Sequence, residues 1–125
     1  MAINPTGPGL KTFLEAAPDE PVVMLNLLRF RPNGGQESYQ KYLAMFGRYA
    51  AEVGAEVLYY GEGNEALVAE AGQDWDAVLL VKYPTRRAFS EMVRTPAYQQ
   101  GTHLRDDALV EAVLQPTVPH PMPST

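Results

Sequence analysis

Two short segments of this chain are apolar on both faces if they form strands, and they constrain the fold more than any other feature. Val22–Phe30 reads VVMLNLLRF, and Ala77–Tyr83 reads AVLLVKY. Successive residues of a strand point to opposite faces of a sheet, so these strands need cover on two sides. A chain of 125 residues suits one domain, which cannot easily supply both layers. The pattern therefore indicates a single-domain protomer that forms a dimer.

Helical periodicity predicts three main helices. The first covers Thr6–Ala17, with Thr6 as the N-cap and Pro18 as the stop. The second covers Ser38–Val53, carries a wide aromatic stripe and ends at Gly54. The third follows a Thr85 cap and buries apolar residues at helical spacing, with a further turn after it. In the sequence these are Ala88, Phe89, Met92 and Val93, and the turn is Ala97–Gly101.

Shorter apolar segments predict the remaining strands. Glu56–Tyr60 and Ala66–Glu70 form either one long bent strand or a hairpin, and Leu109–Leu114 forms the last strand. The resulting order is strand, helix, strand, strand, helix, strand, which is typical of the α+β ferredoxin-like split βαβ fold. That fold places both helices on one face of a four-stranded antiparallel sheet. We expect a second copy of the chain to cover the other, apolar face.

The chain divides into three parts. Residues 1–20 are an N-terminal helical extension, and residues 21–116 form the ferredoxin-like domain. Residues 117–125 continue a proline-rich segment and are expected to be a flexible tail.

Three stretches of the sequence resemble the DUF1330 family of dimeric α+β barrel proteins. They are PVVMLNLLRFR, GGQESYQKYLAMFGRYAAEVGAEVLYYGEG and WDAVLLVKYPTRRAFSEMVRTPAYQQGTHLRDDAL. The resemblance covers Pro21 to Pro116 and implies a ferredoxin-like protomer and a sheet-to-sheet homodimer. It implies no established reaction, because the wider superfamily includes cofactor-free monooxygenases, isomerases, haem-binding enzymes and proteins without known activity. The fold alone does not choose among these.

Composition argues against several partners. The formal net charge of −5 disfavours nucleic acids and anionic membrane surfaces, which attract basic proteins. The chain has no cysteine, so thiol catalysis, disulfides and thiolate metal sites are excluded. The longest strongly apolar stretch, Val22–Leu28, is far shorter than the ~20 residues that span a bilayer. The N-terminus lacks the pattern of a signal peptide, and we expect a cytoplasmic protein.

Asn26 is the foremost candidate for a binding residue. An amide inside an apolar strand needs hydrogen-bond partners, or it costs about 1–3 kcal/mol. It could line a cavity and bind a polar group of a substrate. Alternatively, it could bond to backbone, to Arg29 or to a tyrosine. We expect its side chain to face the helix-covered interior together with Met24 and Leu28, because the pleat places these three residues on one side.

His103 is the candidate catalytic residue. It is the only histidine in the predicted folded region, and an imidazole can act as a general base. In a helix it would share a face with Asp106 or Asp107. The alternative is an exposed histidine in a polar connection. Because His120 falls in the proline-rich tail, no metal site is expected, and no cofactor is implied.

Arg29, Tyr39 and Tyr59 complete the candidate substrate-binding set. An arginine can hold a carboxylate through two hydrogen bonds, although arginines more often form surface ion pairs. A cavity lined by tyrosines suits a planar ligand, whereas the plainer interpretation places these rings in the core and the dimer interface. Two functions remain open. One is a small-molecule binder or cofactor-independent enzyme, and the other is a non-catalytic dimeric module.

Overall fold

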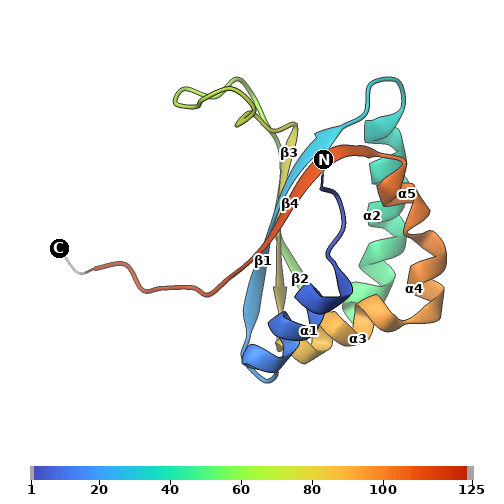
Figure 1. Cartoon of the computed structure of the whole chain (residues 1–125), viewed down its shortest axis with the longest axis vertical. Coiled ribbons are helices and arrows are strands. Elements are labelled where there is room, and N and C mark those ends of the chain that lie inside the picture. Colours follow the sequence, from blue (N-terminus) through green and yellow to red (C-terminus); the bar gives the residue numbers. More distant parts are fainter. Residues whose placement is uncertain (1, 124–125) are drawn as a thin grey trace.

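A four-stranded antiparallel sheet with helices on one face forms the protein in the computed structural model, which describes residues 2–123 (Figure 1). The strands are β1 (Val22–Phe30), β2 (Glu56–Glu62), β3 (Ala77–Tyr83) and β4 (Leu109–Thr117). Their order in the sheet is β2-β3-β1-β4, with β1 and β3 in the centre. This is the ferredoxin-like arrangement, so the predicted α+β fold class is confirmed.

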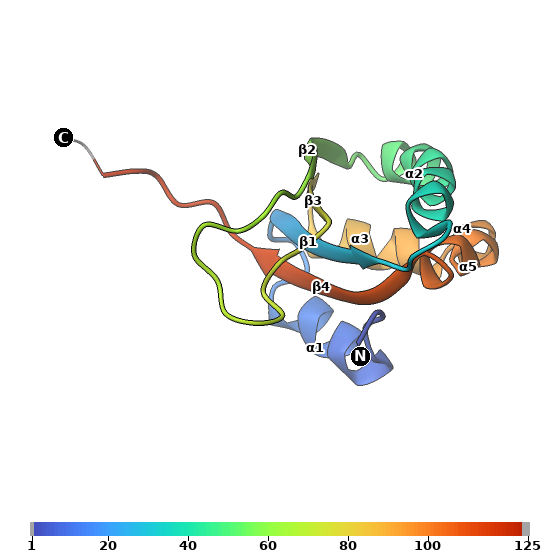
Figure 2. The same cartoon turned by 90° about the horizontal axis from the view of Figure 1, so that it is seen from above.

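Five helices accompany the sheet in the described residues. They are α1 (Gly7–Ala16), α2 (Gly35–Glu52), α3 (Arg86–Arg94), α4 (Pro96–Gly101) and α5 (His103–Asp106). Viewed from above, α2 to α5 lie on one side of the sheet, and α1 lies beside the β4 edge (Figure 2). None of these helices is long and apolar enough to cross a membrane.

The helix ends follow the chemistry of the sequence. Thr6 Oγ1 accepts a hydrogen bond from Gly9 N, and Thr85 Oγ1 accepts one from Ala88 N, each at 3.0 Å. These two N-caps satisfy amide groups that a helix leaves free in its first turn. Gly54 follows the end of α2 with a φ of 78°, a left-handed conformation that glycine adopts without strain. The predicted caps and the predicted stop of the second helix are therefore confirmed.

Strand register determines which side chains enter the core. Asn26 of β1 lies opposite Leu79 of β3 and Leu114 of β4, and Met24 lies opposite Val81. Paired residues of neighbouring strands share a sheet face, so these side chains all point toward the helices. They form, with the aromatic face of α2, a single core between the sheet and the helices.

The opposite face of the sheet carries no helix in the described residues, as Figure 2 shows. It presents Leu25 and Leu27 of β1 beside Leu80 and Val78 of β3, with Val113 of β4 opposite Leu27. These five side chains are only partly buried. We call them the open face. Its apolar character agrees with the need for two-sided cover that the sequence indicates.

One expected strand is wrong. Residues 66–70 form neither a long bent strand nor a hairpin arm, because β2 ends at Glu62 and a loop, which we call the arm, fills residues 63–76. Polar side chains bond to the backbone of the arm instead of a neighbouring strand: Ala66 N donates to Asp74 Oδ1 at 3.3 Å, and Glu70 N donates to Gln73 Oε1 at 2.8 Å. Leu67 and Val68 in the arm are 102% and 95% exposed.

The last strand is longer than predicted. β4 continues to Thr117, whose Oγ1 donates to Val23 O at 2.7 Å. The tail therefore begins one residue later than position 117, and residues 118–123 have no regular secondary structure. In Figure 1 the tail and the arm both project on the side of the sheet away from α2.

Replacing glycine by alanine is expected to have opposite effects on stability at two positions of α2. A Cβ at Gly35 would lie 2.7 Å from Ala108 O, whereas a Cβ at Gly47 would meet nothing within 4 Å. Gly35→Ala is expected to lower the free energy of unfolding by about 1–3 kcal/mol through overpacking. Gly47→Ala is expected to raise it by about 0.5–1 kcal/mol, because alanine favours a helix over glycine. Urea unfolding of both variants tests the pair, and equal effects would contradict this account.

Candidate functional site

A cavity of about 270 Å³ lies between the helix-facing side of the sheet and the helices. Its polar walls include Asn26 of β1, Tyr83 of β3, Tyr39 and Tyr42 of α2, and Tyr98 of α4. We call it the tyrosine cavity. Its apolar walls include Met24, Phe46, Leu79, Val81, Phe89 and Met92. A mostly apolar cavity with a few converging polar groups is typical of a small-molecule site.

Asn26 reaches this cavity from the middle of the sheet. It is 8% exposed, and its Nδ2 donates to Met24 O at 3.4 Å and to Leu79 O at 3.3 Å. Both bonds are longer than the usual 2.9–3.0 Å and are therefore weak. Its Oδ1 accepts no hydrogen bond from any residue in the range 2–123. The side chain thus faces the helix-covered interior, as the pleat predicts, with one acceptor left open.

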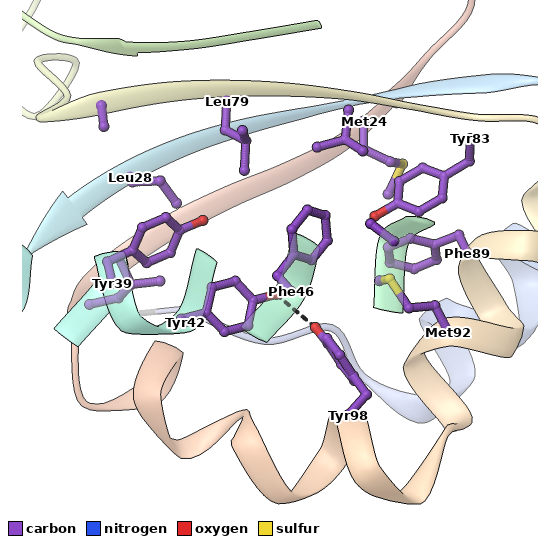
Figure 3. Close-up of a cluster of buried hydrophobic side chains, with 14 of the residues drawn as sticks. Met24, Leu28, Tyr39, Tyr42, Phe46, Leu79, Tyr83, Phe89, Met92 and Tyr98 are labelled. Atoms are coloured by element: carbon purple, nitrogen blue, oxygen red, sulfur yellow. Dashed lines mark hydrogen bonds between the residues drawn. The ribbon is translucent and has the colours of Figure 1, made fainter. Parts of the chain in front are cut away.

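The tyrosine hydroxyls surround the same space. Figure 3 shows the hydroxyls of Tyr39 and Tyr83 pointing toward the centre of the core from opposite ends. Neither makes a hydrogen bond within the described part of the chain. Tyr42 and Tyr98 share a hydrogen bond of 2.7 Å between their oxygens, so one of them retains a free proton. The four rings are nevertheless between 1% and 6% exposed.

Burial keeps these phenols neutral. Desolvation raises the pKa of Tyr39, Tyr42 and Tyr83 well above the ordinary value near 10, because a phenolate would lose its hydration. The pKa of Tyr98 is also raised by desolvation, while its hydrogen bond with Tyr42 and the charge of Arg105 oppose that rise. The cavity therefore offers neutral O–H donors and the amide acceptor of Asn26 to whatever occupies it.

His103 lies outside this cavity. It is exposed on the short helix α5, and its Nδ1 lies 3.0 Å from Gln100 O. The helical turn does not give it the expected aspartate partner, since Asp106 Oδ1 instead accepts a hydrogen bond from Asn4 Nδ2 at 2.9 Å.

No group of three metal-ligating side chains occurs in the described residues.

The structure also separates Arg29 and Tyr59 from Asn26. Arg29 lies two residues after Leu27 in β1, so its side chain points to the open face. There its Nε lies 3.2 Å from Glu111 Oε1. Its other nitrogens donate to the carbonyls of Gly72 and Asp74, which fastens the arm to the sheet. Tyr59 also belongs to the open-face side of β2 and is 54% exposed. The structure thus brings together Asn26 and Tyr39, and leaves His103, Arg29 and Tyr59 outside the cavity.

Arg105 is a cavity residue that the sequence analysis missed. It lines the cavity and is 7% exposed, although it lies in the polar run HLRDD. A signal for it existed: Tyr98, Thr102 and Arg105 follow at i, i+4 and i+7, the spacing of one helical face. All three positions line the cavity. The missed signal was helical periodicity carried by polar rather than apolar residues.

The sheet order, the one-sided helices and the internal cavity define a protein of the ferredoxin-like α+β class. The chain belongs to the DUF1330 family, described as a domain of unknown function, whose model matches residues 34–115. This confirms the family resemblance seen in the sequence. None of the curated proteins matches the chain significantly.

Solved structures show the same fold. A protein of unknown function from Rhodopseudomonas palustris is 29% identical, with a TM-score of 0.89 over 96% of this chain and 98% of that one. A hydroxynitrile lyase from Passiflora edulis is 14% identical, with a TM-score of 0.63 over 85% of this chain and 100% of that one. A dimeric ferredoxin-like protein of unknown function from Jannaschia sp. CCS1 is 11% identical, with a TM-score of 0.61 over 79% and 99%. At these identities the last two show the fold alone.

The buried phenols predict alkaline instability. Their folded pKa values lie above the unfolded value of about 10, so the unfolded chain releases these protons first as pH rises. The free energy of unfolding is therefore unaffected by them below about pH 10 and falls above it. Tyr83→Phe is expected to flatten that fall, as measured by urea unfolding across this range. If ultraviolet titration shows all seven tyrosines ionising near pH 10 in the folded protein, the account is wrong.

Proposed function

We propose that this protein binds a small molecule in the tyrosine cavity, either as a binding protein or as a cofactor-independent enzyme. The observation that carries the proposal is a cavity of about 270 Å³ with hydrogen-bonding groups left open inside it. The oxygens of Asn26, Tyr39 and Tyr83 have no partner within residues 2–123. Buried polar groups are normally hydrogen-bonded, and a core built only for stability would fill or pair them.

The chemistry of the walls favours a ligand with acceptor oxygens. Neutral phenols donate hydrogen bonds to a carbonyl or to an oxygen that gains negative charge, which is the way such donors assist a reaction. An enzyme of this design would polarise a carbonyl through one of the tyrosines. The hydroxynitrile lyase of similar fold supports only the point that this architecture can accommodate an enzyme.

Asn26→Leu separates a ligand-binding role from a structural one. The two hydrogen bonds of Asn26 are long, so we expect the substitution to change the free energy of unfolding by less than about 1 kcal/mol. It should remove the stabilisation that a ligand from a metabolite thermal-shift screen gives to the wild-type protein. Loss of about 1–3 kcal/mol with ligand binding unchanged would assign Asn26 a structural role instead.

We further infer that two copies of the chain associate through their open faces. Leu25, Leu27 and Leu80 lie near the middle of that face, and Tyr59 of β2, which pairs with Leu80, is 54% exposed beside them. The arm and the tail project on the same side (Figure 1). The dimeric relative from Jannaschia sp. CCS1 supports the inference by its description. This association also favours the second candidate function, a dimeric interaction module, and it is compatible with a ligand in each protomer.

A charge on the open face tests the association. Light scattering at micromolar concentration is expected to give twice the chain mass for the wild-type protein. Leu80→Asp should dissociate or unfold it, because the dimer would bury an unpaired carboxylate. Ala44→Asp, on the exposed side of α2, is the matched control and should leave the mass unchanged. A monomeric wild-type protein would refute the inference.

A further inference from the structure

Arg105 is a buried cation without a carboxylate partner. Three other arginines each lie within 4 Å of an acid: Arg29 with Glu111, Arg86 with Glu20, and Arg87 with Asp19. Arg105 is 7% exposed, yet it forms no such ion pair with the described residues. Buried charges are normally paired, because removing a lone charge from water is costly.

Only one nitrogen of the Arg105 guanidinium, Nη1, makes hydrogen bonds with the described residues. Its Nη1 donates to Ile3 O and to Asn4 Oδ1, the second at 2.8 Å. Two hydrogen bonds use both hydrogens of Nη1, whereas Nε and Nη2 keep three N–H groups without acceptors in the described residues. Nε and Nη2 of Arg105 are also not fully buried. In residues 2–123 the only fully buried side-chain nitrogen or oxygen without a partner is Nε of Arg86, so the unpaired nitrogens of Arg105 remain accessible.

The nearest acid in sequence does not neutralise Arg105 directly. Asp106 also lines the cavity, but it accepts its hydrogen bond from Asn4 and lies beyond the 4 Å of an ion pair. The field of Arg105 instead acts on the cavity. Its charge lowers the pKa of Tyr39 and Tyr42, although desolvation, the larger effect, raises them. Arg105 thus lines the same cavity as the tyrosine hydroxyls.

We propose that Arg105 is the anchor for a carboxylate group, and that the ligands of the tyrosine cavity are small aromatic monocarboxylic acids. The free Nε and Nη2 edge matches the two oxygens of a carboxylate in a bidentate pair. The tyrosine and phenylalanine rings provide an apolar wall for a planar body. The volume of about 270 Å³ lies at the lower end of the roughly 300–1,000 Å³ of small-molecule sites, which suits a ligand with one ring. This inference rests on the proposed function.

Acids and their primary amides provide the test, because each pair has the same size and differs in charge. The probes are benzoate with benzamide, phenylacetate with phenylacetamide, and 4-hydroxybenzoate with its amide, titrated calorimetrically into the full-length protein. At least one acid is expected to bind about tenfold more tightly than its amide, since charge-assisted bonds are roughly twice as strong as neutral ones. Arg105→Gln should abolish this preference. Arg105→Lys should keep part of it, because lysine retains the charge without the fork.

Arg48→Gln is the matched control. It removes one positive charge from the exposed side of α2, and Arg48 is not among the residues that line the cavity, so the preference for acids should persist. The comparison of acids with amides on the wild-type protein decides the question even if Arg105→Gln does not fold.

Three results would overturn the inference. In the first, the wild-type protein binds acid and amide equally well, which leaves the proposed function standing. In the second, the preference survives in folded Arg105→Gln, which places the anchor elsewhere. In the third, no acid binds. If the thermal-shift screen then finds an uncharged ligand that requires Asn26, only the carboxylate class fails. If it finds none, the proposed function fails as well.

Discussion

The antiparallel pairing of β1 with β3 supports every other part of the structure. These two central strands align Val22 with Tyr83 and Leu28 with Ala77, so the whole helix-facing row has a fixed register. A slip of one residue would exchange the two faces of a strand, and Asn26 would leave the cavity for the open face. Because both strands are apolar almost throughout, the hydrophobic pattern alone does not decide which face of each strand is buried against the helices. The position of Asn26 therefore depends on side chains that favour one register. Tyr83 is one of them, because its ring packs edge-on against the Phe89 ring, with 5.1 Å between the ring centroids.

Arg86 and Arg87 at the start of α3 are held by residues far away in the sequence. Two cations in a first helical turn are unfavourable with the helix dipole. Here Arg86 N donates to Glu20 O, and Arg87 N donates to Pro18 O. The Arg86 guanidinium lies 4.7 Å from the Phe13 ring and also bonds to the Phe13 carbonyl. Their side chains thus join α3 to α1 through Phe13, and to the connection after α1 through the ion pairs with Asp19 and Glu20.

Much of the fold could be predicted from periodicity, whereas the site could be predicted only in part. The apolar strands, the aromatic helix ending at Gly54 and the capping threonines act locally, so the sequence shows them directly. Asn26 was found because a polar residue in an apolar strand conflicts with its surroundings. The strand expected at residues 66–70 failed because local β propensity does not provide a neighbouring strand. Arg105 was missed because its burial depends on Ile3 and Asn4, about one hundred residues away.

The N-terminal residues have a practical consequence for handling the protein. Ala2 O accepts a hydrogen bond from Ala112 N at the edge of β4, and Asn4 and Pro5 line the cavity. A purification tag joined ahead of Ala2 would therefore begin next to the tyrosine cavity. A tag on the other terminus would leave from the side of the open face (Figure 1). The two ends of the chain thus lie near different surfaces, so a tag at one end would disturb the proposed ligand cavity and a tag at the other the proposed dimer surface.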